Sequence, residues 1–130
     1  MNKYVLDSFA VLSFLQQERG WERVRELLED ATEGKIELHM SIINLAEVKY
    51  LIARRGRNTP HVTAAIEALP ISIVSADECI ELVIDLKTKY SISLADCFGA
   101  AAAIQLDCPI VTSDPEFKQL GNTLKIEWLN

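Results

Sequence analysis

The sequence lacks any apolar run of about 18 residues, the length that a helix needs to cross a membrane. Its start also lacks the apolar stretch of a secretory signal, because Asp7 interrupts it. Cysteine is scarce, and Cys79, Cys97 and Cys108 have no C-x-x-C spacing and lie in apolar segments, so we expect reduced core thiols and neither disulfides nor zinc ligands. These absences predict a cytoplasmic protein with no membrane partner.

Positive charge is in the minority in this chain. There are 13 lysines and arginines against 19 acids, a net charge of −6, which argues against binding nucleic acid through an overall positive field. A nuclease is not excluded, because acids that bind a metal ion count in the formal charge yet are neutralised by the cation. The length of 130 residues, 49% of them hydrophobic, predicts one compact domain spanning residues 1–130.

The sequence alternates between short apolar segments and longer segments with helical periodicity. We predict strands at residues 4–6, 36–40, 71–74, 109–112 and 124–128. We predict helices at residues 9–15, 21–33, 41–55, 61–69, 75–90, 93–106 and 115–121, the fifth of them opened by a capping box at 75–78. Such alternation indicates an α/β fold with a central, mostly parallel sheet of about five strands flanked by helices on both faces.

One acid stands out within a predicted helix. Asp96 is the only charged residue between Tyr90 and Leu106, and no lysine or arginine lies within one helical turn of it. Burying an unpaired carboxylate is costly, so such a group protonates, pairs with a cation or binds a metal ion. The partner of Asp96 must therefore come from elsewhere in the fold.

Three further acids lie inside or directly after apolar elements. Asp7 and Asp114 follow predicted strands, and ligands of open α/β sheets collect beyond the carboxyl ends of the strands. Glu47 lies one turn after Ile43 and one turn before Leu51, so it interrupts an apolar stripe. We expect Glu47 to be at least half buried.

Each acid also has a structural explanation. Asp7 and Asp114 are suited to cap the helices that follow them, and Asp96 is suited to the first turn of its helix, where a carboxylate meets the helix dipole. Glu47 has a candidate partner in Arg54–Arg55. Taken singly, these explanations are preferable, but four such acids in one small chain favour a shared site.

Four carboxylates that converge repel one another unless a cation lies among them. A set of oxygen ligands selects a hard cation, so we expect Mg²⁺, with Mn²⁺ as a substitute, and we do not expect His39 or His61 to be ligands. Such a site supports phosphodiester hydrolysis, because bound metal activates a water and neutralises charge on the phosphate.

Four segments in this order closely resemble the PIN-domain ribonucleases, in particular the VapC-type toxins of toxin-antitoxin pairs. They are Val5-Leu6-Asp7-Ser8, Asn44-Leu45-Ala46-Glu47, Leu94-Ala95-Asp96 and Ile110-Val111-Thr112-Ser113-Asp114. The resemblance covers essentially the whole chain, and it implies a PIN-like fold and Mg²⁺-dependent endoribonuclease activity on RNA. It also implies a cognate antitoxin as inhibitor and a homodimer.

By this resemblance, the catalytic and metal-binding residues are Asp7, Glu47, Asp96 and Asp114, with Ser8 and Thr112 as supporting polar groups. The chain departs from the family pattern at Phe9, where many members have a small polar residue, and at Pro115. Glu116 either shares the metal role of Asp114 or is a solvated acid in the first turn of a helix, and the second interpretation is preferred.

Several basic and aromatic residues have two interpretations. Arg54, Arg55 and Arg57 either contact RNA phosphates or oppose the dipole at the end of a helix. Weaker candidates for RNA contact are Lys49, Lys87, Lys89 and Lys118. Base stacking is open to Tyr50, Trp21 and Trp128, but a core position is preferred for each of them.

Two other functions compete with the ribonuclease. A catalytically silent PIN scaffold that acts as a binding module would have the same fold, although the presence of all four acids argues against it. A phospho-acceptor signalling domain has similar length and acidity, but it needs paired acids after the first strand, and here Asp7 is followed by Ser8 and Phe9. We therefore favour the metal-dependent ribonuclease.

Overall fold

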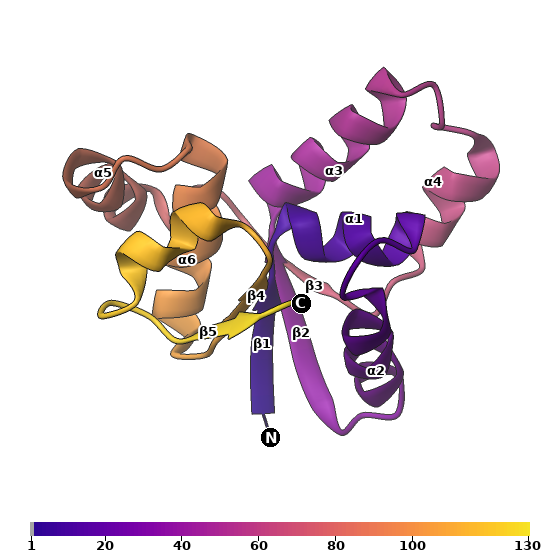
Figure 1. The fold of residues 1–130 in the computed structure, drawn as a ribbon, viewed down its shortest axis with the longest axis horizontal. Helices are drawn as coiled ribbons and strands as arrows, with labels where there is room; N and C mark the ends of the chain where they lie inside the picture. The colour runs from indigo at the N-terminus through magenta and orange to yellow at the C-terminus, as the bar shows by residue number, and fades with distance from the viewer. Residues whose placement is uncertain (1) are drawn as a thin grey trace.

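A five-stranded, fully parallel sheet forms the centre of the computed structural model, which describes residues 2–130 (Figure 1). The strands are β1 (Asn2–Leu6), β2 (Ile36–Ser41), β3 (Ser72–Val74), β4 (Ile110–Thr112) and β5 (Ile126–Trp128). Their order across the sheet is β3-β2-β1-β4-β5. The predicted α/β class and the parallel sheet are confirmed.

The strand order reverses its direction beside β1. The chain first runs outward from β1 to β2 and β3, and then returns so that β4 pairs with the other side of β1. The segment after β1 therefore leads toward one edge of the sheet and the segment after β4 toward the other, and a crevice forms beyond the carboxyl ends of these two strands. This crevice is the position at which ligands bind in open α/β sheets.

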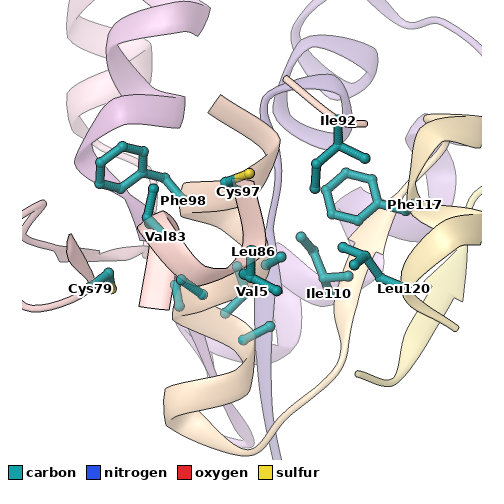
Figure 2. Close-up of a cluster of buried hydrophobic side chains, with 14 of the residues drawn as sticks. Val5, Cys79, Val83, Leu86, Ile92, Cys97, Phe98, Ile110, Phe117 and Leu120 are labelled. Atoms are coloured by element: carbon teal, nitrogen blue, oxygen red, sulfur yellow. The ribbon is translucent and has the colours of Figure 1, made fainter. Parts of the chain in front are cut away.

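Helices cover both faces of the sheet, as predicted (Figure 1). They are α1 (Ser8–Gln16), α2 (Trp21–Thr32), α3 (Ile42–Arg54), α4 (Pro60–Glu67), α5 (Ile80–Lys89), α6 (Leu94–Leu106) and the 3₁₀ helix η1 (Pro115–Leu120). Val5 and Ile110 point from the sheet into the cluster formed with α5, α6 and η1 (Figure 2). Leu6 and Val111, next along each strand, point to the opposite face, where α1 to α4 pack.

The apolar character of α6 follows from its central position. It contacts α3, α5 and the strands β1, β2 and β4, so nearly its whole circumference is buried. Gly99 lies where a Cβ would approach Asn44 Oδ1 to 3.0 Å, so α3 and α6 come too close for a side chain at this position. The tight packing brings the first turns of these two helices to the same edge of the sheet.

The predicted capping box of α5 is wrong. Residues 76–79 form a turn, and the helix begins at Ile80 without a side-chain cap. The Glu78 carbonyl accepts a hydrogen bond from Gln105 Nε2 at 2.8 Å, which joins this turn to α6. The three thiols are free and buried, as expected, and residues 2–130 contain no helix that is both long and apolar enough to span a membrane.

Candidate metal centre

Two of the predicted acids lie just after the central strands β1 and β4. Asp7 caps α1 and accepts a hydrogen bond from the Ala10 amide at 2.8 Å. Asp114 caps η1 and accepts one from the Glu116 amide at 2.9 Å. Both capping interpretations are therefore confirmed, and the sheet topology also places both carboxylates at the crevice beside β1 and β4.

Asp96 lies in the first turn of α6, whose cap is Ser93. The residue is only 4% exposed, and its Oδ2 atom is buried without a hydrogen-bond partner. No lysine or arginine of the described chain forms an ion pair with it. A buried carboxylate oxygen without a partner normally lowers the stability of the fold. Asp96 is therefore expected to bind a ligand or to carry a proton.

The electrostatics of the site favour protons in the absence of a cation. Burial raises the pKa of Asp96 to about 9, and the nearby carboxyls of Glu116 and Asp114 act in the same direction. Burial also raises the pKa of Asp7 to about 7, although hydrogen bonds from Thr112 and Ala10 oppose the shift. The carboxyls thus share a region in which several negative charges cannot coexist without compensation.

Three carboxylates come close enough together to be ligands of one ion. One oxygen from each of Asp96, Asp114 and Glu116 lies within 4.8 Å of the other two. Glu116 is exposed, as the preferred interpretation expected, yet it belongs to this trio. The orphaned oxygen of Asp96 and an all-oxygen donor set fit a hard cation such as Mg²⁺.

The other two predicted acids lie beside the trio and outside it. Asp7 and Glu47 interact electrostatically, since the Glu47 charge contributes to the raised pKa of Asp7. Glu47 is partly buried on α3, as expected, but within residues 2–130 it has no ion-pair partner. Arg55, one of its candidate partners, donates instead to Gln16 at 2.7 Å.

Thr112 connects the two acids that follow the central strands. Its buried hydroxyl donates to Asp7 Oδ2 and accepts from the Asp114 amide at 2.9 Å. With the Ala10 amide on Oδ1, both oxygens of Asp7 have fixed partners. The hydroxyl therefore orients Asp7 and sets the path of the chain into Asp114.

Asn44 supports the site, and this role was not predicted from the sequence. Its buried amide nitrogen donates to Ser8 Oγ at 3.2 Å and to the Ala95 carbonyl at 3.1 Å, and Ser8 donates back to the Asn44 carbonyl at 3.3 Å. The network joins the first turns of α1, α3 and α6, and the hydrogen bonds of the Ser8 hydroxyl are with Asn44 and not with an acid. The spacing of the sequence could have indicated that Asn44 is buried, because it lies four residues before Val48 and eight before Ile52 on the buried face of α3.

Replacing Asn44 with alanine is expected to lower the free energy of unfolding by about 1–3 kcal/mol, because the Ala95 carbonyl and the Ser8 hydroxyl lose a buried partner. Urea denaturation of purified protein measures the loss. Asn58→Ala, the same change in an exposed loop, is the control. Equal stability of the two variants would show that the network does not hold the helices together.

Comparison with known structures shows the same fold in proteins of low sequence identity. VapBC2 from Rickettsia felis, solved with a DNA fragment from their promoter, has 22% identity and a TM-score of 0.74, with 98% of this chain and 99% of that chain covered. VapBC-1 from nontypeable Haemophilus influenzae has 22% identity and a TM-score of 0.64, with 97% of each chain covered. FitAcB from Neisseria gonorrhoeae has 18% identity and a TM-score of 0.66, with 95% of each chain covered.

Curated protein sequences give no match to this chain. A family model described as PIN domain, however, matches residues 4–122, which include every acid of the site. The resemblance seen in the sequence is thereby confirmed at the level of the family, and the structures agree with it in fold. The chain belongs to the PIN domain family.

Proposed function

We propose that this protein is a Mg²⁺-dependent endoribonuclease toxin of the VapC type, working as a single domain in the cytoplasm. The catalytic residues are Asp7, Glu47, Asp96 and Asp114, the acids expected to bind the metal, and Glu116 is added to them as a ligand because it belongs to the carboxylate trio; Mn²⁺ is an alternative cation. The observation that carries the proposal is the buried, unpartnered Asp96 oxygen within a trio of carboxylates. A purely structural acid would have a partner in the fold.

Asp96, Asp114 and Glu116 would hold one cation, and Asp7 and Glu47 face the same region. When bound, the cation supplies a water of lowered pKa and neutralises negative charge on the phosphate. The chain contributes orientation, because Thr112 and Ala10 fix the Asp7 carboxylate before substrate arrives. The fold also buries Asp96, and the limited access of water strengthens electrostatic interactions at this carboxylate.

The rim of the site supports a protein partner. Phe9, Ile42 and Leu94 are 43%, 38% and 55% exposed, and each lies at the start of a helix that borders the acids. Exposed apolar residues around a polar centre are typical of protein contacts. We infer that a cognate antitoxin covers this rim, by analogy with the toxin-antitoxin structures that share its fold. The homodimer is proposed from the sequence resemblance alone.

Cleavage of a mixed cellular RNA pool by purified protein tests the proposal directly. We expect discrete products with Mg²⁺ or Mn²⁺ and none with EDTA, because the carboxylates need a cation to act on a phosphodiester. The sequences at the new ends identify the preferred target. If intact RNA remains in every reaction, the silent-scaffold function gains support over the ribonuclease.

A further inference from the structure

A hollow of about 430 Å³ lies next to the acidic site, and the proposed function does not use it. Its lining includes Arg19 from the turn between α1 and α2, Ser113, Pro115 and Lys118 around the start of η1, and Trp128 at the end of β5. Ser113 and Pro115 flank Asp114, so the hollow adjoins the carboxylate trio. Its volume is within the range of small-ligand sites.

The walls of the hollow are held together by tertiary contacts. Gly20 has a φ of +89°, and a Cβ at this position would lie 2.9 Å from Leu129 Cβ, so only glycine lets the α1–α2 turn pack onto the C-terminal segment. Figure 1 shows the C-terminus beside this turn. Arg23 binds Glu127 with two hydrogen bonds of 2.8 and 3.0 Å, which fastens α2 to β5. The hollow is therefore preformed and does not depend on closure of a loop.

The charged side chains that line the hollow are both cations. Arg19 and Lys118 form no ion pair within residues 2–130, whereas Arg23, Lys35 and Lys89 each pair with an acid. The charges of Arg19 and Lys118 are therefore not neutralised by an ion pair, although the chain as a whole has a net charge of −6. They create a local positive region where phosphates next to a scissile bond would lie.

Trp128 adds a surface on which a base can stack. It is 37% exposed and lies at the end of β5, an edge strand of the sheet. Trp21 differs, because the Arg25 guanidinium covers its ring at 5.0 Å from the centroid. Aromatic side chains bind unpaired bases by stacking, whereas bases in a duplex are already stacked on each other.

We propose that this hollow binds nucleotides of single-stranded RNA that flank the cleaved bond, with Trp128 stacking on a base and Arg19 and Lys118 contacting phosphates. The inference rests on the proposed ribonuclease function for its placement of the substrate. It predicts that these three residues determine affinity for the strand and leave the chemistry at the acids unchanged.

Binding is measured in EDTA, where no cleavage occurs, with a fluorescein-labelled single-stranded RNA of about eight nucleotides. We expect the double variant Arg19→Ala/Lys118→Ala to raise Kd about 10-fold or more. The slope of log K against log salt concentration should become shallower by about 1.4, the value for two lost phosphate contacts on a single strand. Lys35→Ala/Lys89→Ala removes the same charge from two paired, exposed lysines and should bind like the wild type. The charge-conserving double variant Arg19→Lys/Lys118→Arg should bind RNA nearly as well as the wild type.

The fluorescence of Trp128 gives an independent signature. In Trp21→Phe this residue is the remaining tryptophan of the two in the chain, and RNA binding should quench its emission with the same Kd. Trp128→Leu should weaken binding of the labelled single strand and leave a duplex of the same length unaffected. Equal binding of single strand and duplex by the wild type, or emission that RNA does not change, would overturn the stacking role.

Hydrolysis of bis(p-nitrophenyl) phosphate with Mn²⁺ separates this inference from the proposed function. The small diester needs the acids and not the hollow, so Arg19→Ala/Lys118→Ala should retain its rate within about twofold while cutting RNA about 10-fold more slowly. If the wild type binds RNA through Arg19 and Lys118 but hydrolyses neither substrate, the ribonuclease fails and the RNA site stands. If the double variant binds and cuts RNA like its control, the RNA site fails and the ribonuclease stands.

Discussion

Asp96→Asn is expected to reduce RNA cleavage on the order of 100-fold or more and, at the same time, to stabilise the metal-free fold. Loss of one preorganised electrostatic group in an active site commonly has an effect of this size on the rate. The fold should gain stability because the asparagine amide carries no charge, while Asp96 is buried with an unpartnered oxygen and a pKa raised to about 9. A variant that loses activity but gains stability identifies Asp96 as a metal ligand, because replacing a structural residue would lower stability.

Asp107→Asn is the matched control for this substitution. It makes the same chemical change at the other end of α6, where Asp107 is exposed and has a φ of +51°, a conformation that asparagine tolerates well. We expect cleavage by this variant to stay within about twofold of the wild type, since only loss of an active-site group has a large effect on the rate. Cleavage rates with Mg²⁺ and urea denaturation in EDTA provide the two measurements. The role of Asp96 is refuted if its variant cuts RNA as fast as Asp107→Asn.

The sequence was sufficient to predict the α/β fold and the proximity of Asp7 and Asp114. Asp7 and Asp114 follow apolar strands, and parallel strands present their carboxyl ends at one edge, so their proximity could be predicted without coordinates. Asp96 was identified because a lone charge interrupts an apolar helix. These predictions succeeded where local pattern and sheet geometry determine the outcome.

Features that depend on tertiary contacts were missed or predicted wrongly. Glu116 lies in a first turn that suits a solvated acid, and only the path of η1 past α6 brings it to Asp96. The α5 capping box is wrong because the chain turns at residues 76–79 and the helix begins only at Ile80, while the Glu78 carbonyl accepts a hydrogen bond from Gln105 of α6. Asn44 has the spacing of a core residue, but its partners Ser8 and Ala95 are 36 and 51 residues away in the chain. Local sequence cannot specify such pairings.

The metal-free protein is expected to lose stability as the pH rises, and Mg²⁺ is expected to reverse the trend. The folded-state pKa values of Asp7 and Asp96, about 7 and about 9, lie above the unfolded value of 3.8, so the folded protein binds more protons between these limits. The contribution of these two carboxyls to the free energy of unfolding is therefore fully present below about pH 4. It falls by up to about 1.4 kcal/mol per pH unit for each group, until about pH 7 for Asp7 and about pH 9 for Asp96.

Metal binding requires deprotonated carboxylates, so the stabilisation by Mg²⁺ should grow over the same pH range. A concentration of 100 times Kd adds about 2.7 kcal/mol to the free energy of unfolding. Urea denaturation between about pH 5 and 8, in EDTA and in excess Mg²⁺, measures both trends. Asp96→Asn should make the EDTA profile shallower below about pH 7, where Asp7 still titrates, and nearly flat above it, and should lose most of the Mg²⁺ effect, whereas Asp107→Asn should change neither. A wild-type profile that is flat in EDTA and insensitive to Mg²⁺ would mean that the buried acids neither share protons nor bind the cation, and the acidic centre would then have no role beyond capping its helices.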